Sequence, residues 1–343
     1  MAILKRNEPC LCGSGKKYKK CCLNKIQTKQ NFDLSDQRAY NELLPKLFDY
    51  SKEFDYQIQP IYEKYVASFD RLSKADAQAF SQLLFHWMIF NYPVNEESET
   101  ILVNYIKQQG PMYSEKFQQF LQEWNDLQPR IFRITASDNK QIIVYDIFHD
   151  QSITIEKTPA SANLNEGDRI IGYLYPTPTG HSLGNDAIAI PEKLEEAFLA
   201  HWNNMKKITE RRFATDIKSE QDWFSDHFHD ALDVLGLMFV SGKDLLAEDK
   251  LSEPSKHVLQ ILSEKIELEP SNYTSFMNAK IRWISYTLKH APRIQKPEAF
   301  AAALEYWVSK QASNSHISQK KLAEKYHVSV STISNKYKDI NDF

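Results

Sequence analysis

The stretch ISQKKLAEKYHVSVSTISNKYKDI, residues 317–340, predicts two short helices joined by a tight turn. Ser318 and Ser329 each stand where a helix N-cap is needed, because a serine oxygen can accept a hydrogen bond from a free N–H of the first turn. The positions expected to face inward recur at helical spacing and are Leu322, Ala323 and Tyr326, followed by Val330, Ile333 and Tyr337. His327 would take the turn position, which glycine fills more readily because it tolerates a left-handed backbone. Two helices joined in this way form a helix-turn-helix.

The second of these helices would present small polar side chains and a lysine to solvent. The residues expected to contact nucleic acid are Ser331, Thr332, Ser334, Asn335 and Lys338. Such side chains can enter a major groove and reach base edges or phosphates. A helical hairpin that serves only as a scaffold or a protein interface is the alternative.

The same stretch resembles the helix-turn-helix of bacterial regulators. Together with the preceding KPEAFAAALEYWVSKQ, residues 296–311, it also resembles the closing helices of the cyclin-like repeat in transcription factor B. The resemblance implies a helix-turn-helix domain over residues 293–343 that binds nucleic acid, with DNA favoured over RNA.

A second distinctive stretch, EPCLCGSGKKYKKCCLNK at residues 8–25, contains all four cysteines of the 343-residue chain. In a reducing compartment, clustered cysteines are typical of metal sites, and four thiolates complete the tetrahedral shell of a structural zinc ion. The expected zinc ligands are Cys10, Cys12, Cys21 and Cys22. The expected basic surface around the zinc, which would offset the thiolate charge, consists of Lys16, Lys17, Lys19 and Lys20. Two disulfides or four free thiols are the alternatives, and the adjacency of Cys21 and Cys22 disfavours disulfides.

The segment RNEPCLCGSGKKYKKCC, residues 6–22, resembles the SEC-C motif, a small zinc module found at the C-terminus of the SecA preprotein translocase ATPase. The resemblance implies that the four cysteines bind zinc and that the module contacts partner proteins, ribosomes or nucleic acid. It covers about residues 6–24 only. The rest of the chain lacks the glycine-rich phosphate loop of that ATPase, so no ATPase activity is implied.

Between these two ends the hydrophobic period changes twice. Apolar residues at helical spacing predict helices, and a stretch of short runs rich in isoleucine, valine and tyrosine predicts five antiparallel strands in a small barrel. One of these runs is DRIIGYLYPT, residues 168–177, and the stretch PTPTGHSLGND, residues 176–186, is expected to be loop. The expected fold class is therefore mainly α and multidomain. The expected parts are a SEC-C-like zinc module (1–26), a helical region (31–128), a small β-barrel-like domain (129–191), a helical region (192–292) and the helix-turn-helix (293–343).

Charge is unevenly distributed along the chain. The formal net charge is −3, yet residues 1–30 carry eight Lys or Arg against one acid and residues 310–343 carry six Lys against three acids. Basic ends on an acidic body indicate that the ends meet an anionic partner, although solvated tails would show the same pattern. No apolar run approaches the length of a membrane helix and no signal peptide is visible, so we expect a cytoplasmic protein without membrane contact.

The histidines and acidic residues elsewhere in the chain do not predict a metal-binding or catalytic site. His86 lies in a dense aromatic stretch and is expected to be packed in the core. His227 and His229 lie beside two aspartates, but on one continuous helix positions i and i+2 face different ways, so these rings are not expected to converge. No nucleophile–base motif or paired-carboxylate motif appears, and we expect no enzyme.

These observations favour a zinc-containing nucleic-acid-binding adaptor, with a bacterial DNA-binding regulator as the first interpretation. Three alternatives remain. Both basic ends could bind ribosomal RNA or a ribosomal protein. The SEC-C-like module could bind a chaperone or translocase component. The helical body could contain an enzyme site whose residues are distant in sequence.

Overall fold

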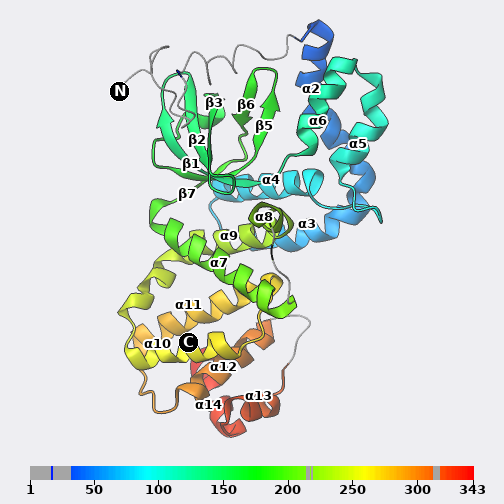
Figure 1. The fold of residues 1–343 in the computed structure, drawn as a ribbon. Helices are drawn as coiled ribbons and strands as arrows, with labels where there is room; N and C mark the ends of the chain where they lie inside the picture. Colours follow the sequence, from blue (N-terminus) through cyan, green and yellow to red (C-terminus); the bar gives the residue numbers. More distant parts are fainter. Residues whose placement is uncertain (1–16, 18–31, 214–216, 218, 312–316) are drawn as a thin grey trace. The chain divides into compact units, whose positions relative to one another are not determined.

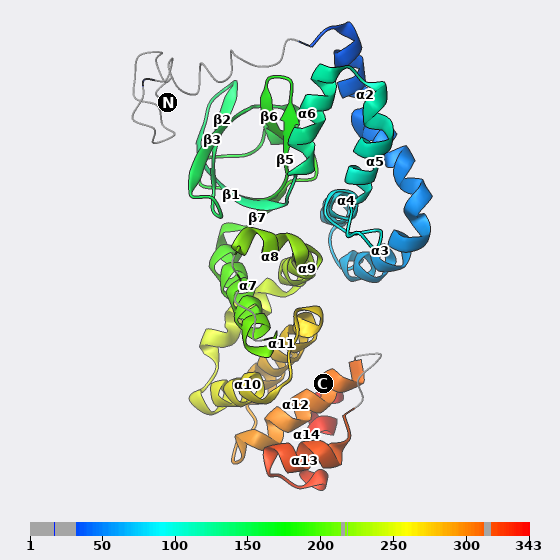
Figure 2. The ribbon, with the colours of Figure 1, turned by 45° about the vertical axis from the view of Figure 1, so that its right-hand side comes forward.

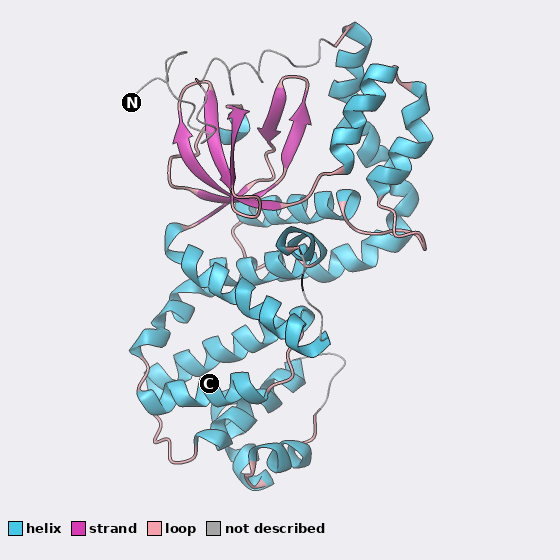
Figure 3. Ribbon diagram, in the orientation of Figure 1, coloured by secondary structure: helices cyan, strands magenta, loops and turns pink. Residues whose placement is uncertain are grey.

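The computed structural model describes residue 17 and residues 32–213, 217, 219–311 and 317–343 (Figure 1). The chain divides into two compact units. The first comprises Met1–Ala197 and Ile217–Leu232, and the second comprises Phe198–Asp216 and Asp233–Phe343. Helices dominate and one small antiparallel sheet system accompanies them, which confirms the predicted mainly α, multidomain class (Figure 3). The predicted zinc module lies outside the described residues, except for Lys17.

The helices of the first unit are α2 (Leu34–Tyr50), α3 (Asp55–Phe69), α4 (Lys74–Phe90), α5 (Ile101–Gln109), α6 (Glu115–Asn125) and α8 (Glu220–Asp226). Most of them begin at a polar N-cap residue, and α3, which follows Phe54, is the exception among these. Short 3-10 turns connect α2 to α3 at η2 (Ser51–Phe54) and α5 to α6 at η3 (Gly110–Met112), and a further one, η4 (Pro159–Ser161), lies among the strands. The second half of α4 is apolar almost all round and is buried on nearly every side, so α4 lies at the centre of the helical layer.

The strands of the first unit form a five-stranded antiparallel sheet in the order β3-β2-β1-β4-β7 and a separate hairpin, β5-β6. They are β1 (Arg130–Ser137), β2 (Gln141–Asp146), β3 (Gln151–Glu156), β4 (Arg169–Gly172), β5 (Leu174–Thr177), β6 (Gly180–Leu183) and β7 (Ile188–Ile190). Figure 2 shows the strands curving around in a barrel-like form. Their inward side chains make one apolar core that includes Phe132, Val144, Ile170 and Leu183.

The sequence predicted five strands here, and two details were wrong. The expected strand over residues 168–177 is divided into β4 and β5, which belong to different sheets. The division falls at Gly172, whose φ of 158° and close approach to Ala187 leave little room for a side chain. Strand β6 was expected to be loop, because its residues Gly180–Leu183 include no β-branched residue; it forms by pairing with β5 across a tight turn.

The second unit is entirely helical in its described residues. It contains most of α7 (Glu192–Phe213) and α9 (Phe228–Leu245), then α10 (Glu253–Lys265), α11 (Tyr273–His290), α12 (Pro297–Gln311), α13 (Gln319–Tyr326) and α14 (Val330–Asn341), with 3-10 turns η5 (Leu246–Lys250) and η6 (Pro270–Asn272). Helix α12 packs against α10, α11, α13 and α14. Its buried alanines, Ala299 and Ala301–Ala303, are small enough to let these neighbours approach closely.

A break in the helical region overturns one expectation. Helix α8 ends at Asp226 and α9 begins at Phe228, so His227 lies between two helices instead of within one. His227 Nδ1 and His229 Nε2 therefore both approach Asp230 Oδ2, at 3.2 and 3.5 Å. The expectation that these two histidines would not converge was wrong, because it assumed an unbroken helix.

The inward-facing side of the helix-turn-helix follows the predicted pattern in part. Leu322, Tyr326 and Ile333 are buried as expected. Ala323 and Tyr337 are half-buried, and Val330 is 43% exposed. Val330 is the first residue of α14, directly after the cap, and the helix instead buries Ile340 near its other end. The apolar stripe of α14 is thus shifted toward the C-terminus.

We expect Ile333→Ala to destabilise the second unit by about 2–5 kcal/mol, because it empties a fully buried site. Val330→Ala is the matched control and should cost less than about 1 kcal/mol, since its side chain is largely in water already. Urea unfolding of the full chain, followed by circular dichroism, measures both. Equal losses of stability would contradict the placement of α14.

Candidate nucleic-acid interface

Local hydrogen bonds fix the ends of both helices in the helix-turn-helix. The Ser318 hydroxyl accepts from the Lys321 N–H at 3.2 Å, and the Ser329 hydroxyl accepts from the Thr332 N–H at 3.1 Å. Between them His327 adopts the left-handed conformation, with φ 55° and ψ 44°. These caps and this turn residue were predicted, and the structure confirms them.

A buried carboxylate joins α12 to α13. Glu305 of α12 is only 2% exposed, and it accepts hydrogen bonds from the Tyr326 hydroxyl at 2.5 Å and from Lys325 Nζ at 2.7 Å. Burial and the neighbouring Glu305 carboxylate raise the pKa of Tyr326 far above its ordinary value, so this hydroxyl keeps its proton and remains a donor. A buried carboxylate is costly unless its oxygens are paired, and here both are.

The C-terminal end of α14 is held by an arginine from α11. Arg282 donates from Nε to the Ile340 carbonyl at 2.9 Å and from a terminal nitrogen to the Asn341 carbonyl at 2.6 Å. The last carbonyls of a helix have no partner within the helix and carry partial negative charge, so a guanidinium suits them. Helix α14 is therefore anchored at both ends.

The outward face of α14 carries the side chains that the sequence selected. Ser331, Ser334, Asn335 and Lys338 are exposed, whereas Thr332 is half-buried and its hydroxyl lies 2.7 Å from that of the Ser329 cap. Four of the five predicted contact residues are thus exposed on one helix, and of these the Ser331 hydroxyl lies 3.0 Å from that of Ser329. Whether they touch nucleic acid stays a prediction.

Lys336 points toward α12 and not toward the exposed face of α14. Its ammonium lies 4.7 Å from the centre of the Phe300 ring and 3.2 Å from an Asp339 oxygen. The Tyr306 and Tyr337 rings meet edge to face nearby, with centroids 4.9 Å apart. A lysine stem over an aromatic ring can cover apolar surface while its charge stays near water.

The predicted zinc ligands, Cys10, Cys12, Cys21 and Cys22, lie outside the described residues, as do Lys16, Lys19 and Lys20. Lys17 is described and is exposed. Within the described part of the chain, no group of three or more His, Cys, Asp or Glu side chains is arranged to hold a metal ion. No helix there is long and apolar enough to cross a membrane.

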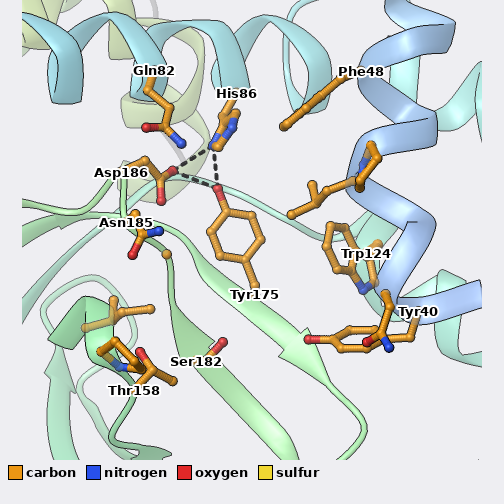
Figure 4. Close-up of a pocket in the computed structure, with 16 residues that line it drawn as sticks. Tyr40, Phe48, Gln82, His86, Trp124, Thr158, Tyr175, Ser182, Asn185 and Asp186 are labelled. Atoms are coloured by element: carbon orange, nitrogen blue, oxygen red, sulfur yellow. Dashed lines mark hydrogen bonds and ion pairs between the residues drawn. The ribbon is translucent and has the colours of Figure 1, made fainter. Parts of the chain in front are cut away.

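His86 belongs to a buried polar cluster that the sequence did not predict (Figure 4). Its burial was expected and is confirmed, at 4% exposed. Its Nδ1 also lies 2.7 Å from the Tyr175 hydroxyl and 2.8 Å from Asp186 Oδ2, partners that are 89 and 100 positions away along the chain. Nothing in the local pattern around any of the three residues predicts this cluster.

Comparison with known families agrees with both terminal interpretations. Residues 6–24 match the SEC-C motif, and residues 296–341 match the helix-turn-helix of the Psq domain. The class is thus a multidomain, mainly helical protein with a SEC-C motif at one end and a helix-turn-helix at the other.

Nearly the whole chain also aligns with a curated protein. This relative, the uncharacterized protein YccF of Bacillus subtilis (strain 168), is 30% identical over 361 residues, which cover 99% of this chain and 95% of YccF. The chain therefore belongs to the YccF family. No solved structure matches it.

Removal of the Tyr326 hydroxyl should weaken the helix-turn-helix. We expect Tyr326→Phe to lower the free energy of unfolding of the second unit by about 1.5–3 kcal/mol, because the buried Glu305 carboxylate loses one of its two donors. Urea unfolding measures the change. Tyr337→Phe, on the same pair of helices but only half-buried, is the matched control and should change little. An equal effect of the two variants would show that Glu305 does not hold α13.

Proposed function

We propose that this protein is a zinc-containing DNA-binding regulator that acts in the cytoplasm without catalysis. The observation that supports it best is the outer face of α14, where Ser331, Ser334, Asn335 and Lys338 are exposed on a helix fixed at both ends. A rigid helix loses little conformational entropy when it enters a groove. Little of the free energy gained from its contacts is therefore lost to ordering of the helix.

The chemistry of this face fits a major groove. Asn335 has an amide that can pair with an adenine edge, and the two serine hydroxyls can donate to or accept from any base. Lys338 supplies a charge for a phosphate. Thr332, which is partly engaged at the cap, would contribute to helix position more than to base contact.

Charge at the two ends supports an anionic partner. The C-terminal residues 310–343 carry an excess of lysine, and so do residues 1–30, whereas the remainder of the chain is acidic. Phosphate contacts supply most of the sequence-independent affinity for DNA, and a basic end on an acidic body directs those contacts to that end.

The SEC-C motif would add a second basic module held by zinc. Four cysteine thiolates at Cys10, Cys12, Cys21 and Cys22 provide the donor set of a structural zinc ion. Apparent zinc binding free energies of about 10–16 kcal/mol are enough to fold a short peptide that has almost no apolar core. The lysines between the cysteine pairs would then face an acidic partner, on DNA, a ribosome or another protein.

The double variant Asn335→Ala with Lys338→Ala tests the interface. We expect its affinity for duplex DNA to fall about tenfold or more, with the salt dependence of log K reduced by about one phosphate contact. Fluorescence anisotropy at several salt concentrations measures both quantities. Lys250→Ala, an exposed lysine in η5, is the matched control and should leave affinity and salt dependence unchanged.

Unchanged affinity and salt dependence in the double variant would refute the role of α14. Binding that persists at high salt would point to a protein partner, because phosphate contacts weaken steeply as salt rises. Preferential binding to ribosomal RNA over duplex DNA would move the function to the ribosome.

Cys21→Ser tests the metal. We expect the zinc content of the purified full chain, measured by mass spectrometry, to fall from about one ion per chain to about none, since three thiolates bind zinc much more weakly than four. The far-ultraviolet circular dichroism of the helical body should not change. Ser14→Ala, within the same motif but not a predicted ligand, should retain its zinc. Full zinc retention in Cys21→Ser would refute the ligand set.

A further inference from the structure

Cations from two neighbouring helices cap the C-terminal ends of the helix-turn-helix. Arg282 of α11 donates to the Ile340 and Asn341 carbonyls at the end of α14, at 2.9 and 2.6 Å. Lys265, the last residue of α10, donates from Nζ to the Lys325 carbonyl near the end of α13, at 2.8 Å. The two helices are thus fixed to α10 and α11 as well as to each other.

The Arg282 guanidinium is itself held by aromatic rings. It lies 5.4 Å from the centre of the Trp307 ring of α12 and 6.0 Å from the centre of the Phe343 ring. Phe343 follows α14 and packs on α11, where its ring meets those of Tyr286 and His290 edge to face, with centroids 5.8 and 5.4 Å apart. A guanidinium is planar and donates in a rigid fork, so it constrains the direction of the carbonyls that it binds.

Apolar contacts alone would not fix the direction of α14. Ile333 and Ile340 are fully buried and keep the helix against the rest of the unit. Burial of apolar surface is non-directional, however, and allows a helix to tilt, whereas hydrogen bonds depend on angle as well as distance. The Ser329 cap supplies such bonds at the N-terminal end, and Arg282 supplies them at the C-terminal end.

A small tilt of α14 would be enough to disturb contacts with bases. The helix has 12 residues and is therefore about 18 Å long. A tilt of about 10° at the Ser329 cap would move the far end by about 3 Å, and Asn335, near the middle, by about 1.5 Å. Hydrogen bonds tolerate donor–acceptor distances of only about 2.7–3.2 Å, so a shift of this size breaks them.

We propose that Arg282 is a positioning residue for DNA recognition: by holding the C-terminal end of α14, it determines which base edges the exposed side chains of that helix reach. The inference rests on the proposed function, because it concerns the same interface. Arg282 acts through α14, whose last carbonyls occupy two of its donors. The part of the chain that reads DNA therefore includes α11, which precedes the segment 296–341 that matches the helix-turn-helix family.

A ratio of two affinities tests this role. The native full chain first selects a preferred duplex from a random library, and fluorescence anisotropy then compares that duplex with one in which a single base pair is altered. We expect Arg282→Gln to lower the ratio about tenfold, the discrimination that about one base contact supplies. Partial unfolding would weaken binding to both duplexes by the same factor, so a merely structural role leaves the ratio unchanged.

Two further arginine variants make the comparison sharper. Arg282→Lys should give an intermediate ratio, because lysine retains a charge near the last carbonyls but lacks the fork. Arg130→Gln is the matched control, since Arg130 donates to the buried Asp146 carboxylate of the first unit at 2.9 Å. This control should lose stability and keep the ratio of the native chain.

Phe343→Ala keeps the test available should Arg282→Gln fail to fold. Phe343 is 37% exposed, so its removal spares the core, and it should lower the ratio several-fold by leaving the guanidinium less constrained. Amide hydrogen exchange, followed by mass spectrometry, examines the clamp without DNA. We expect residues 338–341 to exchange several-fold faster in Arg282→Gln than in the native chain, because the end of α14 frays.

An unchanged ratio in both Arg282→Gln and Phe343→Ala would overturn the proposal. So would unchanged exchange at the end of α14, or a fall of the ratio in Arg130→Gln that equals the fall in Arg282→Gln. Failure of the native chain to select any duplex would overturn the proposed function together with this role. A native chain that selects a duplex which the Arg282 variants distinguish equally well would overturn this role alone.

Discussion

The carboxylate of Glu305 is the constraint on which the C-terminal half depends. It is buried in α12, the helix that contacts α10, α11, α13 and α14, and it is satisfied only when Tyr326 and Lys325 of α13 reach it. An unpaired carboxylate at this depth would be far more costly than an apolar residue. The network therefore selects one position of α13 over α12, and the turn at His327 then sets the direction of α14. A helix placed in this way can present a fixed set of side chains.

The first unit also contains a buried carboxylate, that of Asp186, but its hydrogen bonds are incomplete. The Asp186 carboxylate is as buried as Glu305, but only one of its oxygens has donors, from Tyr175 and His86. The C-terminal network is complete and stabilises a scaffold. The network of Asp186 is incomplete, because its Oδ1 is buried without a hydrogen-bond partner among the described residues. Both carboxylates belong to one chain, which also carries the SEC-C motif.

What the sequence could predict was local. Ser318, Ser329 and the turn at His327 were identified because caps and turns depend on residues within three or four positions. Val330 was wrongly expected to face inward, because the apolar period alone does not tell at which residue the buried face of a helix begins. The Glu305–Tyr326 bond spans 21 positions and the His86–Asp186 contact spans 100, and side chains so far apart show no shared pattern in one sequence. Strand β6 was missed because pairing with β5, and not its own residues, makes it a strand.

Crosslinking of the protein to nucleic acid in the cells that make it, followed by sequencing of the recovered fragments, tests the central claim most directly. The account predicts discrete DNA sites that share a short sequence, because a helix fixed at both ends with a few exposed polar side chains reads base edges. Recovery of ribosomal RNA, or of no nucleic acid above background, would contradict it. Either result would assign the exposed face of α14 to a ribosomal or a protein partner.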